Sequence, residues 1–202
     1  MFSGANSAIR FNKDRTNNYY KFSINGYAKG GGNIYSLFNM NTDISTAELS
    51  ANYIFARIFM NCSGLIEAPL FPSLGPLKYE SYYAMFVNCT SLTAAPYLPA
   101  TTAGQNCYAS MFLNCTSLIS AHIGDCFLNT TVYYQNLMGM FENCSSLNYV
   151  EVDWTSWPST DSNTQNWMKD VPATGTFVCP AALVSKIPSR DANGVPAGWT
   201  IV

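Results

Sequence analysis

The sequence predicts an α/β repeat solenoid, a right-handed stack of short parallel strands and short helical turns with a β-rich cap at each end. Three observations predict this fold. An Asn-Cys dipeptide occurs four times at intervals of 26–29 residues, an apolar pair precedes each copy, and a leucine follows each cysteine by three residues. A repeat of this length forms one unit, which must bury its apolar face against its neighbours.

The repeated residues set the register of the predicted stack. The cysteines are Cys62, Cys89, Cys115 and Cys144, and the leucines that follow them are Leu65, Leu92, Leu118 and Leu147. The apolar pairs are Ile58-Phe59, Met85-Phe86, Met111-Phe112 and Met140-Phe141. Weaker copies of the pattern begin at Leu37-Phe38 and Trp167-Met168. We therefore expect about six repeats over residues 34–180.

The first half of each repeat predicts a short helical turn. An apolar residue lies four positions before the second residue of each apolar pair, as Phe55 does before Phe59. Together with the pair, it gives apolar positions i, i+3 and i+4, which form the inward face of an amphipathic helix. We expect one or two helical turns against the core in each repeat.

The second half of each repeat predicts a strand. Counted from the second residue of the pair, positions six, nine and eleven are apolar, as in Leu118, Ala121 and Ile123. The last two of these are two residues apart, which is the period of a strand. The count points position eleven inward, at Leu49, Leu70, Tyr97, Ile123, Val152 and Cys179. The side chains at positions eight, ten and twelve are predicted to point outward, and each position forms one row along the stack. The three rows are Thr46, Glu67, Ala94, Ser120, Tyr149 and Thr176; Glu48, Pro69, Pro96, His122, Glu151 and Val178; and Ser50, Phe71, Leu98, Gly124, Asp153 and Pro180.

The two ends of the chain are predicted to be caps of one continuous domain. Residues 1–33 alternate in the manner of β-hairpins, with a turn at Asn25-Gly26, and form the N-terminal cap. Residues 181–202 form the C-terminal cap and include a final strand, Gly198-Trp199-Thr200-Ile201-Val202. Repeat stacks need such atypical ends, because an open strand edge invites end-to-end association.

The cysteines are predicted to be structural. Seven is an odd number, and an interval of 26–29 residues differs from the C-x-x-C spacing of metal sites. Asn41 takes the cysteine position in the first repeat, so the position favours a small side chain that can bond to backbone. We expect a column of buried, reduced thiols, packed beside the column of leucines, and no metal site.

The composition excludes several classes of partner. Only 11% of the residues are charged, the net charge is −2, and Lys and Arg number 10, so the chain lacks the basic surface that binds nucleic acid. No apolar run approaches the roughly 20 residues of a membrane helix. Met1 is followed by neither a basic segment nor an apolar one, so the sequence as written contains no signal peptide.

Catalysis is not expected. His122 is the only histidine, and a nucleophilic mechanism would need it to pair with a serine or cysteine and an orienting acid. In the predicted register its neighbour is Glu151, a pairing more typical of a surface contact. Gly30-Gly31-Gly32 lacks the Lys-Ser/Thr of a phosphate-binding loop. We expect neither enzyme activity nor a cofactor; a hydrolase that uses His122 is the remote alternative.

A binding surface is the functional feature that the pattern favours. The C-terminal half of the outward face collects aromatic and polar side chains, namely His122, Tyr149, Glu151, Asp153, Trp154 and Trp157. Aromatic rings beside neutral or acidic polar groups suit a glycan or protein ligand. A solvated face without a dedicated ligand is the alternative interpretation.

Two strings in the middle of the chain resemble BspA-type leucine-rich repeats of bacterial surface proteins. They are Met85-Phe86-Val87-Asn88-Cys89-Thr90-Ser91-Leu92 and Met111-Phe112-Leu113-Asn114-Cys115-Thr116-Ser117-Leu118. The segment Ala95-Pro96-Tyr97-Leu98-Pro99-Ala100-Thr101-Thr102 resembles the proline-bearing variant found in gut Bacteroidales. Three places depart from the pattern: Asn41 and Val171 replace cysteine, and His122-Ile123-Gly124-Asp125 lacks the Pro-x-Leu-Pro segment.

The resemblance implies a non-enzymatic binding or adhesion module of a bacterial cell-surface or secreted protein. Its partner would be protein or glycan on a host or bacterial surface, and its location would be extracellular. Similar repeats also occur in phage tail proteins, so a receptor-binding part of a virion is the alternative. The sequence leaves the ligand and the oligomeric state open.

Overall fold

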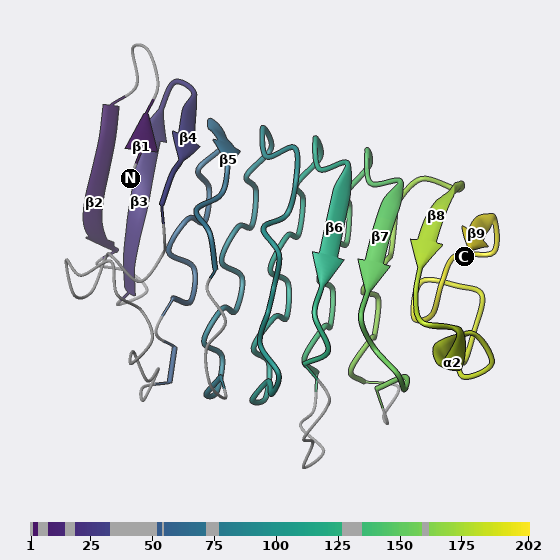
Figure 1. Cartoon of the computed structure of the whole chain (residues 1–202). Helices are drawn as coiled ribbons and strands as arrows, with labels where there is room; N and C mark the ends of the chain where they lie inside the picture. The colour runs from purple at the N-terminus through teal and green to yellow at the C-terminus, as the bar shows by residue number, and fades with distance from the viewer. Residues whose placement is uncertain are drawn as a thin grey trace.

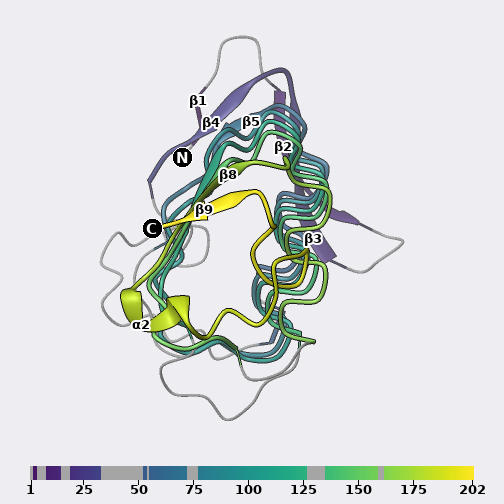
Figure 2. The ribbon, with the colours of Figure 1, turned by 90° about the vertical axis from the view of Figure 1, so that its right-hand side faces the viewer.

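The computed structural model describes residues 2–3, 8–14, 19–32, 52–53, 55–71, 77–126, 135–158 and 162–202. Successive passes of the chain lie side by side from the N-terminal strands to the C-terminal strand (Figure 1). Viewed along this direction, the passes overlay one another around a common interior (Figure 2). The described residues include no helix that is long and apolar enough to cross a membrane.

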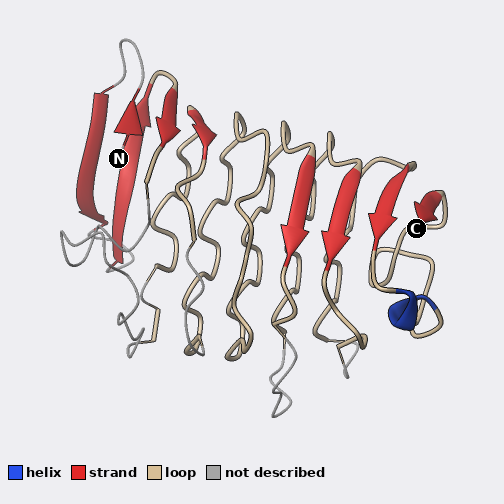
Figure 3. Ribbon diagram, viewed as in Figure 1, coloured by secondary structure: helices blue, strands red, loops and turns tan. Residues whose placement is uncertain are grey.

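Within the described ranges, short strands form three sheets (Figure 3). In chain order the strands are β1 (Phe2–Ser3), β2 (Ala8–Asp14), β3 (Tyr19–Asn25), β4 (Ala28–Gly30), β5 (Leu65–Glu67), β6 (Ser120–Ile123), β7 (Tyr149–Val152), β8 (Gly175–Val178) and β9 (Trp199–Ile201). Helix α2 (Ala181–Val184) lies between β8 and β9. The sheets have the orders β1-β4-β5, β2-β3 and β6-β7-β8-β9.

The C-terminal sheet is parallel throughout, as the repeat pattern predicts. His122 pairs with Glu151, and Glu151 pairs with Val178, so one predicted outward row is confirmed over three repeats. Another row is confirmed by the pairs Ala94↔Ser120, Ser120↔Tyr149 and Tyr149↔Thr176. Parallel pairing between repeats therefore places residues about 27 positions apart in sequence next to each other.

The predicted helical turns are wrong for the described repeats. In their place stand consecutive hydrogen-bonded turns in which every fourth residue has a positive φ, as at Glu80, Ala84 and Asn88. The N–H groups of Ala84, Phe86 and Asn88 donate to carbonyls of the next repeat at 2.8–2.9 Å. The N–H groups between them donate three residues back within the same repeat. An α-helix uses every N–H internally, so it could not supply these bonds between repeats.

Columns of identical residue types fill the interior. Leu65, Leu92, Leu118 and Leu147 are fully buried, as are the four repeated cysteines. The rings of Phe59, Phe86, Phe112 and Phe141 stack nearly parallel, with centroids 5.3, 5.4 and 5.6 Å apart. The predicted columns of leucine and cysteine are therefore both buried, and an aromatic column lies with them.

The repeated asparagine explains the tight corner after each apolar pair. Asn61, Asn88, Asn114 and Asn143 all have φ between 61° and 66°, a left-handed conformation that asparagine tolerates better than most residues. Their amides form a ladder, with Nδ2 of each donating to Oδ1 of the preceding one at 2.6–2.8 Å. One residue type thus supplies both the backbone conformation and a side-chain bond between repeats.

Three of the four repeated thiols donate to backbone of the preceding repeat. Sγ of Cys89, Cys115 and Cys144 lies 3.1 Å from the carbonyl oxygen of Phe59, Phe86 and Phe112 respectively. All seven cysteines are free thiols. Burial raises the pKa of Cys62 and of Cys144 from 9.0 to about 12. The position therefore selects a small, weakly polar donor, in agreement with the predicted structural role.

The N-terminal cap differs from the prediction in its pairing. The hairpin joins β2 to β3 in antiparallel register, Ala8↔Asn25 through Asp14↔Tyr19, so its turn does not lie at Asn25-Gly26. Gly26, with φ of 86°, instead leads from β3 toward β4, and β4 pairs with β1 and with β5. The chain therefore does bend at Gly26, but the two strands that this bend joins pair with different partners and not with each other.

The N-terminal cap covers the first described repeat directly. The ring of Phe22 stacks on Phe59 with centroids 5.1 Å apart, and Sγ of Cys62 donates to the Phe22 carbonyl at 3.2 Å. β3 and β4 therefore occupy the place that a preceding repeat would take. The predicted first repeat, with Leu37-Phe38, Asn41, Ile44, Ala47 and Leu49, lies outside the described residues.

The C-terminal cap closes the other end. The predicted final strand is present as β9, which pairs in parallel with β8. The ring of Trp167 continues the aromatic column, 6.0 Å from Phe141, and its Nε1 donates to the Gly194 carbonyl at 2.7 Å. Helix α2 was not indicated by the sequence pattern; it buries Leu183.

Candidate functional site

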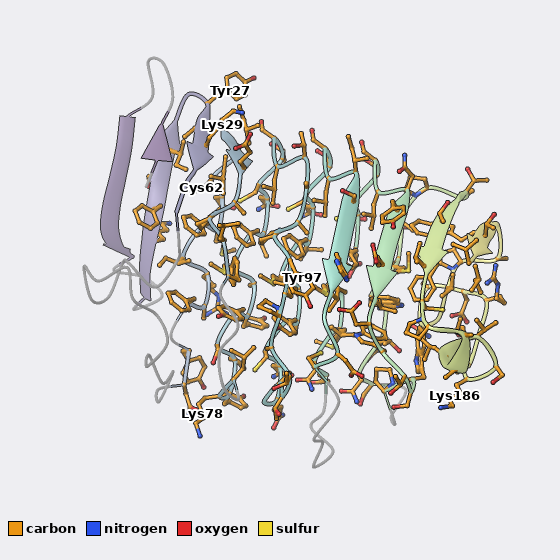
Figure 4. All side chains as sticks on the ribbon, in the orientation of Figure 1. Tyr27, Lys29, Cys62, Lys78, Tyr97 and Lys186 are labelled. Carbon is orange, nitrogen blue, oxygen red and sulfur yellow. The ribbon has the colours of Figure 1, made fainter. Side chains whose placement is uncertain are left out.

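Polar and aromatic side chains converge on the outward face of the C-terminal sheet. His122 is on β6, Tyr149 and Glu151 are on β7, and Asp153 follows β7 directly. Tyr97 comes from the preceding repeat and lies beside β6 (Figure 4). We call these five residues the strand-face cluster.

His122 is at the centre of the cluster. Its Nε2 atom lies 2.9 Å from Oδ1 of Asp153 and 3.9 Å from Oε1 of Glu151. The ring of Tyr97 packs against the imidazole, with centroids 4.6 Å apart and planes tilted by 50°. The structure therefore brings together four of the six predicted site residues, Tyr149 included, and adds Tyr97.

Both carboxylates are held by tyrosine hydroxyls. The Tyr97 hydroxyl donates to Oδ2 of Asp153 at 3.1 Å, and the Tyr149 hydroxyl donates to Oε2 of Glu151 at 2.9 Å. Partial burial, and then the bond to Asp153, raise the pKa of Tyr97. The bond to Glu151 raises the pKa of Tyr149. Each carboxylate thus has one oxygen engaged by a tyrosine and the other oxygen directed at His122.

Tyr97 was missed because the proline-bearing repeat contains one extra residue. Ala94 pairs with Ser120, and Leu98 pairs with Ile123, so four steps along one repeat match three along the next. Tyr97 is consequently 45% exposed and Leu98 is 1% exposed, the reverse of the predicted directions. Pro96 has no N–H to donate to a ladder, which favours such a bulge here.

The same correction applies one repeat earlier. Leu70, which the count pointed inward, is 67% exposed, and Phe71, which it pointed outward, is 7% exposed. Both proline-bearing repeats therefore direct the residue after Ala-Pro to solvent. The shared signal is the Ala-Pro dipeptide at Ala68-Pro69 and Ala95-Pro96, which a uniform count does not take into account.

Gly124 makes room for Tyr97. A Cβ atom at this position would lie 2.7 Å from the Leu98 carbonyl oxygen and 3.1 Å from the Tyr97 hydroxyl. The N–H of Gly124 donates to that same carbonyl at 2.9 Å. The loss of the Pro-x-Leu-Pro segment in this repeat thus coincides with a close approach between two backbones beneath the cluster.

Of the two predicted tryptophans, Trp154 belongs to the interior and Trp157 is partly buried at its edge. The side chain of Trp154 is fully buried, and its Nε1 donates to the Gly124 carbonyl at 3.2 Å. Trp157 is partly buried and packs edge-on against both Trp154 and Trp167. The prediction that Trp154 contacts a ligand is wrong, because Trp154 and Trp157 close the core where the repeats meet the C-terminal cap.

No protein family, curated protein or solved structure matches this chain.

Proposed function

We propose that the chain is a leucine-rich-repeat-like, right-handed solenoid of the BspA type. The regular hydrogen bonds from each described repeat to the next, the asparagine ladder and the stacked phenylalanines support this proposal. Crossovers between parallel strands of one sheet are right-handed in almost all proteins, which supports the handedness. The described N-terminal cap and C-terminal cap would protect its two ends.

Its proposed function is non-enzymatic binding of protein or glycan by the outward strand face, as a module of a bacterial cell-surface or secreted protein. The observation that carries this is the strand-face cluster, in which two exposed tyrosines flank one imidazole and two carboxylates. Tyrosine combines a rigid apolar ring with a hydroxyl, and it is enriched where binding energy concentrates. Carboxylates and imidazole supply the hydrogen bonds that a hydroxyl-rich or amide-rich ligand needs.

The position of the cluster also supports recognition. It lies on neighbouring parallel strands, where backbone pairing between repeats fixes the spacing of the side chains. A site on such a scaffold loses little conformational entropy when a ligand binds. Leu70, which follows Ala-Pro one repeat before Tyr97, is also exposed and offers apolar area at the corresponding position.

A glycan array and an array of extracellular-matrix proteins, probed with the purified chain, test the proposal. We expect saturable binding to members of one ligand class, and Tyr149→Ala should weaken it at least tenfold, which is about 1.4 kcal/mol. Tyr27→Ala is the matched control, because Tyr27 is an exposed tyrosine of the N-terminal cap, away from the cluster (Figure 4). Equal binding by Tyr149→Ala, Tyr97→Ala and the control would show that the strand face is not the site.

A further inference from the structure

We propose that His122, Glu151 and Asp153 form a binding site for a divalent transition-metal ion of the zinc type. One ligand atom from each residue, Nε2 or a carboxylate oxygen, lies within 4.8 Å of the other two. This is the one group of at least three such ligands among the described residues. The inference goes beyond the proposed function, since the ion would bind whether or not the face also binds protein or glycan.

Two of the three distances between the ligand atoms are close to those of a common metal centre, and all three are within 4.8 Å. Zinc lies about 2.0–2.2 Å from nitrogen and oxygen ligands, so at angles of 90–109° two ligands of one ion are about 3.0–3.5 Å apart. The Nε2 atom of His122 is 2.9 Å from Oδ1 of Asp153 and 3.9 Å from Oε1 of Glu151. Shifts of a few tenths of an ångström bring both pairs to these values.

The tyrosine hydroxyls supply the outer support that metal sites use. Metal-binding carboxylates are usually oriented by hydrogen bonds from neighbouring residues that do not touch the metal themselves. Tyr97 donates to Oδ2 of Asp153, and Tyr149 donates to Oε2 of Glu151. Each tyrosine thus holds the oxygen that faces away from His122 and leaves the oxygen near Nε2 available to an ion. Both carboxylates are oriented in the same way, each by one tyrosine hydroxyl. A chance group of surface acids has no reason to share such an arrangement.

The charges favour a cation at this position. Two carboxylates face one imidazole, and neither carboxylate forms an ion pair with a lysine or arginine among the described residues. The acids of two other described ion pairs differ in this respect, because Lys29 holds Glu67 and Lys169 holds Glu142. A divalent cation would balance both carboxylates while neutral imidazole serves as the third ligand.

The donor set selects the class of metal. Imidazole nitrogen suits Zn²⁺ and its first-row neighbours, whereas Ca²⁺ takes six to eight oxygen ligands and Mg²⁺ keeps most of its waters. Three protein ligands on a half-exposed face leave at least one coordination position open to water or to an external donor. The geometry therefore points to a zinc-type site with an open position.

Calorimetric titration of the untagged, folded chain with ZnCl₂ tests the site. We expect one Zn²⁺ per chain, with CaCl₂ binding at least tenfold more weakly. His122→Ala and Asp153→Asn should each reduce zinc affinity at least tenfold. Tyr97→Phe, which keeps the ring and removes only the orienting hydroxyl, should reduce zinc affinity by roughly 10–100-fold, as the loss of a group that orients a metal ligand does. Glu67→Gln is the matched control and should bind as the original chain does.

A spectroscopic measurement separates this site from zinc held elsewhere. His122 is the only histidine, so the chain gives one imidazole spin system, and Mn²⁺ or Zn²⁺ at the site must broaden or shift its resonances. Zinc bound by cysteine thiols would leave them unchanged. The proposal is overturned if the original chain shows no saturable binding, if His122→Ala binds equally well, or if the imidazole signals do not respond. None of these results depends on the outcome of the array experiment.

Discussion

The side chains of His122 and Asp153 meet at 2.9 Å although 31 positions separate them in the sequence. The contact follows from the pairing of β6 with β7, which sets His122 opposite Glu151 and Ile123 opposite Val152. Asp153 then continues past the end of β7, and its N–H donates to the Ile123 carbonyl at 3.0 Å. The backbone register therefore positions this pair.

Removing the charge of Asp153 should consequently leave the fold intact. The ion pair is half-exposed, and exposed pairs contribute about 0–1 kcal/mol, so Asp153→Asn should lower the free energy of unfolding by less than about 1 kcal/mol. Urea unfolding followed by circular dichroism measures this. A larger loss would mean that the cluster is a structural element, and any loss of binding by this variant would then have to be reinterpreted.

The asparagine ladder should contribute more to stability than the strand-face cluster. Asn114 has φ of 62° and bonds to Asn88 and to Asn143 through its amide, both at 2.8 Å. Alanine at this position loses both bonds and strains the backbone by about 1–2 kcal/mol. Each neutral hydrogen bond adds about 0.5–1.5 kcal/mol. We expect Asn114→Ala to cost about 2–5 kcal/mol in urea unfolding.

Glycine separates the two contributions at this corner. Asn114→Gly keeps the left-handed backbone conformation and loses only the side-chain bonds. It should therefore destabilise less than Asn114→Ala by about 1 kcal/mol. If both variants lose the same free energy of unfolding, the whole loss comes from the side-chain ladder. The positive φ of residue 114 would then have no measurable cost for alanine.

The sequence was sufficient to predict the interior columns and insufficient to predict the local backbone. Phe55, Ile58, Phe59 and Cys62 are buried at positions i, i+3, i+4 and i+7, the spacing of a helix. Consecutive turns with a positive φ at every fourth residue bury the same positions, so apolar spacing cannot separate the two conformations. The asparagine and glycine at such positions, as in Asn61 and Gly139, are the signal that favours turns.

The candidate site was predicted where the repeats are uniform and missed where they are not. His122, Glu151 and Tyr149 follow a count that holds from β6 to β8. Tyr97 lies beyond the bulge in the proline-bearing repeat, where the count is off by one residue. The cluster of His122, Glu151 and Asp153 was not predicted as a metal site, because its ligands are far apart in sequence and match no short metal motif.

Because its thiols are buried, the chain should become less stable as the pH rises through the alkaline range. Burial holds the pKa of Cys144 at about 12, whereas in the unfolded chain the pKa has its ordinary value of 9.0. The folded pKa is the higher one, so the stabilisation is complete below pH 9 and is lost as the pH rises from 9 toward 12. Above pH 9, this thiol should lower the free energy of unfolding by up to ~1.4 kcal/mol per pH unit.

Urea unfolding at pH 8 and pH 10 measures this effect when Cys144→Ala is compared with the original chain. Tyrosines and the other thiols titrate in both proteins, so the difference between their pH dependences isolates Cys144. We expect the variant to lose about 1 kcal/mol less than the original chain between these pH values. Identical losses would show that the Cys144 thiolate is tolerated in the folded state, which would contradict the buried column.

Gly124→Ala should disrupt the strand-face cluster, because the added Cβ would displace the backbone that carries Tyr97. The added Cβ would lie 2.7 Å from the Leu98 carbonyl oxygen, a backbone atom that cannot rotate away, and 3.1 Å from the Tyr97 hydroxyl. Overpacking of this kind costs about 1–3 kcal/mol and moves the backbone. Because the Tyr97 hydroxyl holds Asp153, we expect zinc affinity and the environment of the His122 imidazole to change together with stability.

Gly32→Ala is the contrasting variant: its Cβ meets no atom within 4 Å, and its φ of +70° alone should cost about 1 kcal/mol. The imidazole resonances should be unchanged in Gly32→Ala and shifted in Gly124→Ala. The same resonances in both variants would show that Tyr97 keeps its place without Gly124, and that the close approach between the two repeats is not what positions the cluster.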